Sequence, residues 1–500
     1  MRSSFFENLS TFMYPSNLLH HFGVNGKVSG SIGAVGEISD AVVILHGPRG
    51  CGYHYRNSAR RRHQPFYPLF STDMTEAEII SGGTEKLRNV IVDTYNRRRP
   101  GLVVVVPTPI SDILNEDMDA VIRKLREEQH IPVIAVRSEL FSHRDKQYAS
   151  RRLREISKQP VTGSKNLEME LLGCGFTEVL YALAEQWMEP CPTILRSINI
   201  ETLGWGFEGS LVLREIEAFL RICGICVNCR IPSASPLTLK RAPAAQLNVV
   251  KRVRWAKKMK ERFGTEYIHL DGAGRHHGLP GIRRFYEDIA EPLRLTEKMH
   301  ACLDAAEKRV LAETEGDRAY LSGVRCALVC GSIQMAPHIL RQYVRDYGFR
   351  VEHVFLILTP ENRRDMNIDD ELLEKLTGRV EEVAASCSPV KIHLNASDEH
   401  MREVGRQMNV MIGSNDITLA GLGVPVIPAV VETTSLSFES YVRSVKRMRQ
   451  RVESSTVKPD LLLGHMNFSS RDYPLIGDAD TIASREMWSR MWLHRKDGDK

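Results

Sequence analysis

The amino-acid sequence predicts an α/β protein built from three doubly wound domains, in which mostly parallel sheets are flanked by helices. Short runs of apolar and β-branched residues recur along the chain, and segments with helical periodicity lie between them. Such continuous apolar runs are typical of parallel strands that are buried on both faces. The pattern occurs in three successive blocks, and a chain of 500 residues is too long for a single hydrophobic core.

The first block, residues 1–190, begins this pattern. Its expected strands are Ala41–Gly47, Leu102–Pro107 and Ile131–Val136. One helix is expected over Thr75–Asn96, because Thr75 and Glu78 have the spacing of a capping box. Ligands of doubly wound domains bind beyond the carboxyl ends of the strands, so the strand-end loops are the first places to search for a site.

The second block, residues 191–292, is predicted to repeat the pattern. Its expected elements are the strand Thr193–Gly204, the helix Leu211–Ile222, the strand Ile225–Ile231, a helix over Leu247–Phe263, the strand Tyr267–Gly272 and a helix from about Leu279. A charged, helix-like stretch over residues 293–319 follows, and we interpret it as a helical connector between two domains.

The third block, residues 320–458, is predicted to form the last α/β domain. Its expected strands are Val324–Gly331, Arg350–Leu358, Val390–Asn395, Asn409–Gly413 and Val424–Val430. Residues 459–500 are polar and lack clear periodicity, so we interpret them as a C-terminal extension.

The composition is that of an ordinary globular protein. A net charge of +5 is small for this length, and lysine and arginine are spread along the chain, which argues against nucleic-acid binding. No apolar stretch is long enough for a membrane span, and the N-terminus lacks the apolar core of a secretory signal. We therefore expect a cytoplasmic protein whose 10 cysteines are mostly reduced thiols, packed in the core or bound to metal.

The most informative segment is Leu45–Gly83. After the expected strand, Gly50 and Gly52 flank Cys51 in a tight turn where other backbone can approach the thiol closely. A thiol on a strand-end loop, beside backbone N–H groups and several cations, is in an environment that favours the thiolate and metal ligation. The alternative is a glycine-rich turn in which Cys51 is only a small apolar residue.

The motifs HGPRGCG (His46–Gly52) and STDMTEAEIISGG (Ser71–Gly83) resemble a pair of motifs in the first domain of nitrogenase component 1 proteins. The likeness continues in outline through Gly101–Val121 and Asn409–Pro428. It implies that Cys51 is a ligand of an iron–sulfur cluster at a subunit interface, either a 4Fe–4S cluster or a larger P-cluster-like one. It also implies an ATP-dependent, Fe-protein-like reductase as the electron donor.

Two departures from the family pattern bear on this cluster. Neither the upstream segment Phe22–Asp40 nor the strand-end loop Val106–Ile110 contains a cysteine. One thiolate cannot hold a cubane cluster, which needs about four ligands. The resemblance therefore implies a homologous partner subunit that supplies most of the ligands, in a heterodimer or heterotetramer. The alternative is a homodimer whose ligand set is completed by Asp73, His46 or His54.

The family's catalytic cofactor is held by a cysteine in the second domain and a histidine in the third. Near the first position this chain has Asn248–Arg252, without a thiol, and its third domain has no histidine of matching context. The resemblance thus implies a beta-like subunit of a nitrogenase-like oxidoreductase, in which Cys51 helps to relay electrons. Two alternatives stay open: a scaffold subunit that holds a maturing nitrogenase-type metallocofactor without turnover, and a small-molecule binding protein that has lost its metal.

Basic residues form two further candidate sites. Arg275, His276 and His277 follow an expected strand and precede a helix, so they could bind an anionic substrate or transfer protons, although an exposed polar turn has the same pattern. A second group could neutralise cluster charge or receive an acidic electron donor, although a solvated helix face is the commoner explanation. It consists of Arg56, Arg60, Arg61, Arg62 and His63.

Cys223, Cys226 and Cys229 have a spacing that is similar to that of ferredoxins. A helix is expected to end at Cys223, with Gly224 as its C-cap, and a buried strand follows. Because this change from helix to strand separates the three thiols, we interpret them as core residues.

Overall fold

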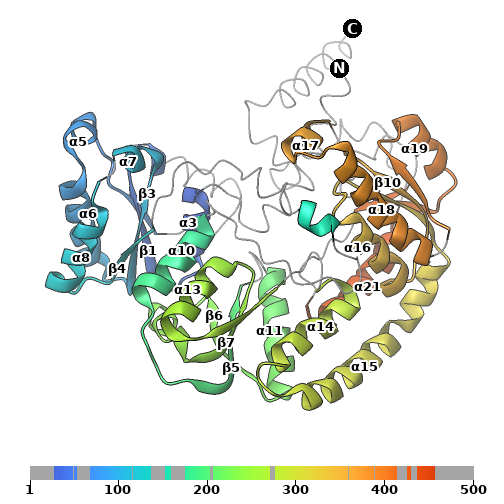
Figure 1. Ribbon diagram of the computed structural model, residues 1–500, viewed down its shortest axis with the longest axis horizontal. Helices are drawn as coiled ribbons and strands as arrows, with labels where there is room; N and C mark the ends of the chain where they lie inside the picture. Colours follow the sequence, from blue (N-terminus) through green and yellow to red (C-terminus); the bar gives the residue numbers. More distant parts are fainter. Residues whose placement is uncertain are drawn as a thin grey trace, which may run out of the picture.

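The computed structural model describes residues 27–48, 50–52, 68–114, 116–136, 153–158, 175–202, 207–270, 276–358, 360–387, 389–413, 425–428 and 436–455. Within these ranges lie three sheets, blue at the left, green at the bottom and orange at the right of Figure 1, each flanked by helices. Every strand pair is parallel. The predicted fold class is therefore confirmed.

The first sheet has the strand order β2-β1-β3-β4. Its strands are β1 (Ala41–His46), β2 (Leu69–Ser71), β3 (Leu102–Pro107) and β4 (Val133–Ala135). Alternate residues of β1 and β3 face two different helical layers, which explains their unbroken apolar sequence. One layer contains α6 (Thr84–Arg98) and α8 (Met118–Gln129), and the other contains α3 (Lys27–Gly36) and α10 (Gly175–Ala182), which continues into η1 (Leu183–Trp187).

The helix expected over Thr75–Asn96 is two helices, α5 (Glu76–Ser81) and α6. The predicted capping box is present, since the Thr75 N–H donates to Glu78 Oε2 at 2.6 Å. The helix is interrupted between Ser81 and Thr84. Gly82 has φ 101°, and a Cβ atom at Gly83 would lie 2.6 Å from Met74 Cε, so both positions favour glycine. The prediction missed this break, which brings Gly83 close to the end of β1.

The second sheet has the order β6-β5-β7-β8. Its strands are β5 (Ile194–Glu201), β6 (Cys226–Ile231), β7 (Ala245–Val250) and β8 (Glu266–His269). The helices around it are α11 (Phe207–Ile222), α12 (Pro236–Lys240), η2 (Ala242–Ala244), α13 (Val253–Phe263) and α14 (Gly278–Ala290).

The prediction of a helix over Leu247–Phe263 was wrong in its first part, because β7 occupies residues up to Val250. The apolar spacing of this segment fits a helix, but β7 lies in the interior of the sheet between β5 and β8. Asn248 is fully buried there and accepts a hydrogen bond from Asn199 Nδ2 on β5 at 2.8 Å. Pairing with distant strands overrides the local helical pattern.

The third sheet has the order β11-β10-β9-β12-β13. Its strands are β9 (Arg325–Cys330), β10 (Arg350–Leu356), β11 (Lys391–Leu394), β12 (Val410–Gly413) and β13 (Val426–Pro428). The helices of this part of the chain are α16 (Ala336–Arg341), η3 (Gln342–Asp346), α17 (Pro360–Asp365), α18 (Asp370–Cys387), α19 (Asp398–Gly405) and α21 (Phe438–Glu453).

The predicted connector is the long helix α15 (Thr296–Ser322), which runs along the lower right of Figure 1, below the third sheet. Ion pairs join it to α21, with Arg309 to Glu439 at 2.6 Å and Lys446 to Glu313 at 2.7 Å. The predicted C-terminal extension, 459–500, lies outside the described residues. None of the helices in the described part of the chain is long and apolar enough to cross a lipid bilayer.

Candidate functional site

Cys51 lies just beyond the carboxyl end of β1, where the sequence predicts it. Pro48 forms a parallel bridge with Met74, and the Met74 N–H donates to the Gly47 carbonyl at 2.9 Å, which joins the two predicted motifs. Gly50 adopts φ 103°, a left-handed conformation that glycine adopts without strain. The Cys51 N–H then donates to the Pro48 carbonyl at 3.4 Å, and the thiol is half-buried.

A buried polar network holds the base of this loop. His46 is fully buried, with Nδ1 lying 3.2 Å from Thr72 Oγ1 and Nε2 lying 2.6 Å from Glu116 Oε2. The other oxygen of Glu116 accepts the Gly83 N–H, and the Gly47 N–H donates to Thr72 Oγ1 at 3.0 Å. Both ring nitrogens of His46 are thus engaged, so this side chain positions the loop and is a poor candidate for a metal ligand.

The strand-end loop after β3 packs against the same turn. Thr108 is almost fully buried, and a Cβ atom at Gly47 would overlap its hydroxyl. Among the described residues, Thr108 Oγ1 has no hydrogen-bond partner. Ser111, at the start of α7 (Pro109–Leu114), fixes this loop by donating to the His46 carbonyl at 2.7 Å. The loops that follow β1 and β3 therefore lie side by side, and Cys51 belongs to the first of them.

The electrostatics of Cys51 differ from the expectation. Burial raises the pKa of its thiol, and the nearby Asp73 carboxylate raises the pKa further. Within the described residues, burial and the Asp73 charge therefore favour the protonated thiol, and the thiolate expected from the sequence stays a prediction. The cations Arg56, Arg60, Arg61, Arg62 and His63 and the candidate ligand His54 lie outside the described residues.

Replacing Asp73 with asparagine is expected to lower the pKa of Cys51, because the carboxylate that disfavours the thiolate is removed. The pH dependence of iodoacetamide alkylation at Cys51, followed by peptide mass spectrometry, measures this shift. Glu76→Gln, which removes a nearby acidic charge on α5, is the matched control and should leave the profile unchanged. An unchanged or higher alkylation midpoint in Asp73→Asn would contradict the assigned role of Asp73.

Two of the three basic candidates of the second block, His276 and His277, lie within the described residues. Arg275 lies outside the described residues. His276 has a fully buried side chain, with Nε2 lying 2.9 Å from Asp288 Oδ2. His277 Nε2 lies 3.1 Å from Gln342 Oε1 on η3, so it joins α14 to the third domain. The structure thus brings the two histidines into packing contacts, and neither takes part in the network around Cys51.

Sequence reasoning missed an ion pair at the carboxyl end of the second sheet. Glu201, at the end of β5, binds the Arg252 guanidinium and accepts the N–H groups of Lys251 and Arg252 at 2.9 and 3.0 Å. Trp255 Nε1 donates to the same carboxylate at 3.0 Å, and Arg252 lies 4.1 Å from the ring centre of Phe176. The sequence pattern that could have indicated this pair is an acidic residue, Glu201, at the end of one apolar strand and a basic residue, Arg252, just after the end of the strand that pairs with it.

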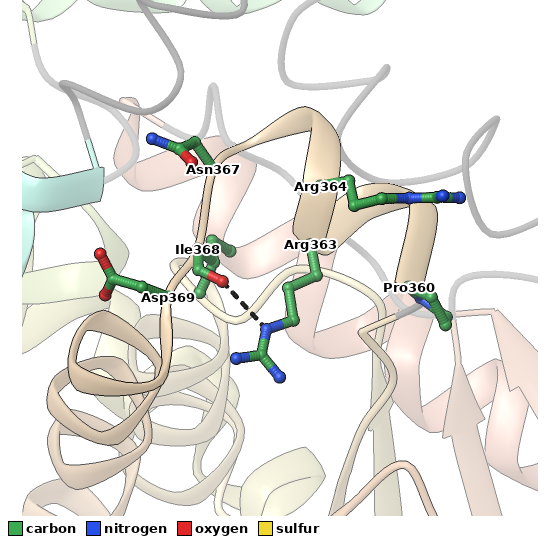
Figure 2. A pocket seen from close by; sticks show the side chains of 6 residues that line it. All are labelled: Pro360, Arg363, Arg364, Asn367, Ile368 and Asp369. Carbon is green, nitrogen blue, oxygen red and sulfur yellow. Dashed lines mark hydrogen bonds between the residues drawn. The ribbon is translucent and has the colours of Figure 1, made fainter.

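The remaining cysteines form no metal site within the described ranges. No group of three or more histidine, cysteine, aspartate or glutamate residues there could hold a metal ion. Cys223 and Cys229 are buried, as predicted, whereas Cys226 is exposed on the first residue of β6, so its interpretation as a core residue was wrong. A cavity of about 460 Å³ in the third domain, shown in Figure 2, is lined by Pro360, Arg363, Arg364, Asn367, Ile368 and Asp369, and none of these belongs to the Cys51 loop.

The donor set near Cys51 fits a contributor to an iron–sulfur cluster. One half-buried thiol and the neighbouring Asp73 are the donors that the described loop presents, since His46 is engaged. A cluster would need further thiolates from another chain.

The comparisons with known proteins identify a family. A family model described as nitrogenase component 1 type oxidoreductase matches residues 27–470. The nitrogenase iron-molybdenum cofactor biosynthesis protein NifE of Clostridium pasteurianum is 24% identical, over 71% of this chain and 73% of that protein. NifE of a Nostoc species is 27% identical, over 68% of this chain and 65% of that protein.

Other relatives are named as reductase subunits. A light-independent protochlorophyllide reductase subunit of Crocosphaera subtropica is 27% identical, over 52% of this chain, and the match spans 49% of that protein. Among solved structures, nitrogenase Cp1 at pH 6.5 has a TM-score of 0.56 and 14% identity, over 86% of this chain and 92% of that chain. This structural likeness supports the fold alone.

Proposed function

Since the chain belongs to the nitrogenase component 1 type oxidoreductase family, we propose that it is a scaffold subunit for the assembly of a nitrogenase-type metallocofactor, without turnover of its own. In this proposal Cys51 gives one thiolate to an iron–sulfur cluster that a homologous partner subunit completes. The observation that carries the proposal is the single half-buried thiol, held by a rigid network on a strand-end loop.

The chain's own residues prepare the thiol for this role. The contact of Gly47 with Thr108 and the contact of His46 with Glu116 fix the loop, so Cys51 loses little conformational freedom when it binds iron. Its raised pKa means that the isolated chain keeps the thiol protonated, and binding to iron must release that proton. A bound cluster would supply the positive metal charge that this release requires and the capacity to accept electrons one at a time.

The second domain supports a role that is shared with a partner. The pair of Glu201 and Arg252 lies at the carboxyl ends of its strands. The described residues at these strand ends include no thiol that could bind a metal cofactor. We infer that the maturing cofactor is held mainly by the partner, while this chain contributes the interfacial cluster ligand.

The partner surface is proposed to lie beside the Cys51 loop. Met74 and Thr108, which contact that loop, are followed directly by α5 and α7. These short helices expose Ile80, which is 87% exposed, and Ile113, which is 65% exposed. Isoleucines that project into solvent beside a candidate interfacial ligand are expected to be covered by another subunit.

Replacing Ile80 and Ile113 with aspartate is expected to weaken association with the partner by at least tenfold, because two charges would be buried in an apolar contact. Anaerobic co-purification and analytical ultracentrifugation measure the complex. Leu237→Asp is the matched control, because Leu237 is 68% exposed on α12, in the second domain. Equal association of all three proteins would exclude this surface as the interface.

The function itself is tested with the full chain purified anaerobically together with the product of a neighbouring gene that encodes a three-cysteine homologue. The proposal predicts bound iron, an iron–sulfur EPR signal after reduction, and transfer of a metallocofactor to nitrogenase that lacks one. Iron-free protein from that co-purification would instead support a binding protein without metal.

A second candidate function is an electron-relay subunit of a nitrogenase-like reductase. Relatives that are named as protochlorophyllide reductase subunits favour it. In that case an ATP-dependent, Fe-protein-like reductase would deliver electrons to the same cluster, and Cys51 would help to set its potential. Reductase-dependent oxidation and reduction of the cluster with multiple turnovers, without cofactor transfer, would favour this candidate over the scaffold.

A further inference from the structure

Two cysteines that have no role in the proposed function meet where the second domain joins the long helix α15. Cys223 follows the last turn of α11 and is fully buried. Cys302 lies in the second turn of α15, is half-buried, and packs against the same apolar core. The two thiols are close enough that Cys302 raises the pKa of Cys223, and both are free.

The helix geometry fixes this meeting independently of the thiols. Gly224 adopts φ 85° and caps α11, with the Ile225 N–H donating to the Leu220 carbonyl at 2.9 Å. A Cβ atom at Gly224 would lie 2.9 Å from Lys298 Nζ. Lys298 and Cys302 are one turn apart on α15, so the helix face that carries both lies on the C-terminal end of α11, at the lower edge of Figure 1.

We propose that Cys223 and Cys302 form a reversible disulfide when the protein meets a peroxide, and that this bond ties the second domain to α15. This modification site is independent of Cys51 and of any cluster. It would make the junction between the second and third domains sensitive to oxidants.

The chemistry assigns a different step to each thiol. Cys302, the more accessible one, reacts first: its sulfur attacks hydrogen peroxide, which leaves a sulfenic acid and one water. Cys223 then attacks that sulfur, the S–S bond forms, and the sulfenic oxygen leaves as a second water. Two thiols are oxidised by two electrons, and the peroxide is reduced.

The surroundings suit a slow, selective reaction. Burial raises the pKa of Cys223 to about 12, which keeps it protonated and protects it from direct oxidation. The positive charge of Lys298 lowers the pKa of Cys223 and would stabilise its thiolate while it attacks the oxidised sulfur of Cys302. Cys226, three positions along the chain, is exposed on β6 and competes as an unpaired target.

The test uses the full chain, purified anaerobically and treated with hydrogen peroxide. Non-reducing peptide mass spectrometry should find a Cys223–Cys302 cross-link that dithiothreitol removes, and the oxidised protein should melt several degrees higher than the reduced protein. Cys302→Ser should abolish both effects. Cys223→Ser should instead leave Cys302 overoxidised to the sulfinic acid, and Cys226→Ser should keep both effects.

Two results would overturn the proposal. One is wild-type protein in which Cys302 becomes a sulfinic acid while Cys223 stays a free thiol. The other is a disulfide in which Cys226 replaces either member of the pair.

Discussion

Replacing Cys51 with alanine is expected to remove the proposed iron–sulfur cluster, or most of its stability, from the proposed complex of this chain with a partner subunit. Replacing a residue that only hydrogen-bonds to a metal ligand lowers metal affinity by about 10- to 100-fold. Replacing the ligand itself should lower the affinity at least as much. The rest of the fold should be unaffected, because the Cys51 side chain is only half-buried and sits at a loop. Iron content and the EPR signal of the co-purified complex measure the effect.

The controls separate ligation from general damage. Cys226→Ala removes an exposed thiol from β6 and should leave both iron and EPR signal unchanged. Asp73→Asn removes the other donor beside the loop and tests whether the cluster needs that carboxylate as well. If Cys51→Ala retained full iron content and an unchanged spectrum, the interfacial cluster would have to be assigned elsewhere, and both candidate functions would lose their site.

Replacing Glu201 with alanine is expected to destabilise the protein by about 3–5 kcal/mol, the usual cost of breaking a buried ion pair. The substitution removes the Glu201 carboxylate from the Arg252 guanidinium, and it removes the acceptor for the N–H of Lys251 and for Trp255 Nε1. Urea titration, followed by tryptophan fluorescence and circular dichroism, should show an earlier unfolding transition of the second domain.

A matched surface variant defines the scale of this effect. Glu266, on β8 of the same sheet, pairs with Lys260 at 2.8 Å, but its side chain is 58% exposed. Glu266→Ala should therefore cost about 0–1 kcal/mol. The double variant Glu201→Ala with Arg252→Met should recover much of the loss, because it removes the stranded charge. A loss in Glu201→Ala no greater than in Glu266→Ala would show that the buried pair does not stabilise the second domain.

The elements that the sequence predicted correctly are those whose pattern is local. The runs at Ala41–His46 and Leu102–Pro107 are apolar on both faces, and in the structure they separate two helical layers. Thr75 and Glu78 form the capping box that their spacing predicts, and Gly224 caps a helix. By contrast, β7 was predicted as helix, because nothing local reveals that Asn248 would be paired with Asn199 on a neighbouring strand.

In the candidate site as well, the local features follow from the sequence and the long-range contacts do not. The glycines around Cys51 and its position at a strand end follow from the sequence, since a tight turn after a buried strand has a local signature. The hydrogen bond between His46 and Glu116 that holds this loop does not follow from the sequence, because the two residues are 70 positions apart. The burial of His276 and its contact with Asp288 also do not follow from the sequence, and a catalytic role for this residue stays a prediction.

By itself, the sequence determined that the protein is a chain of parallel α/β units and that one thiol follows the first buried strand. Both are properties of neighbouring residues, fixed by hydrophobic period and by turn chemistry. Only the tertiary structure decided what surrounds that thiol: the burial and the Asp73 charge that raise its pKa, and the exposed isoleucines on the helices beside it. Burial and charge act through space between residues far apart in the chain, so they become defined only when the strands have paired.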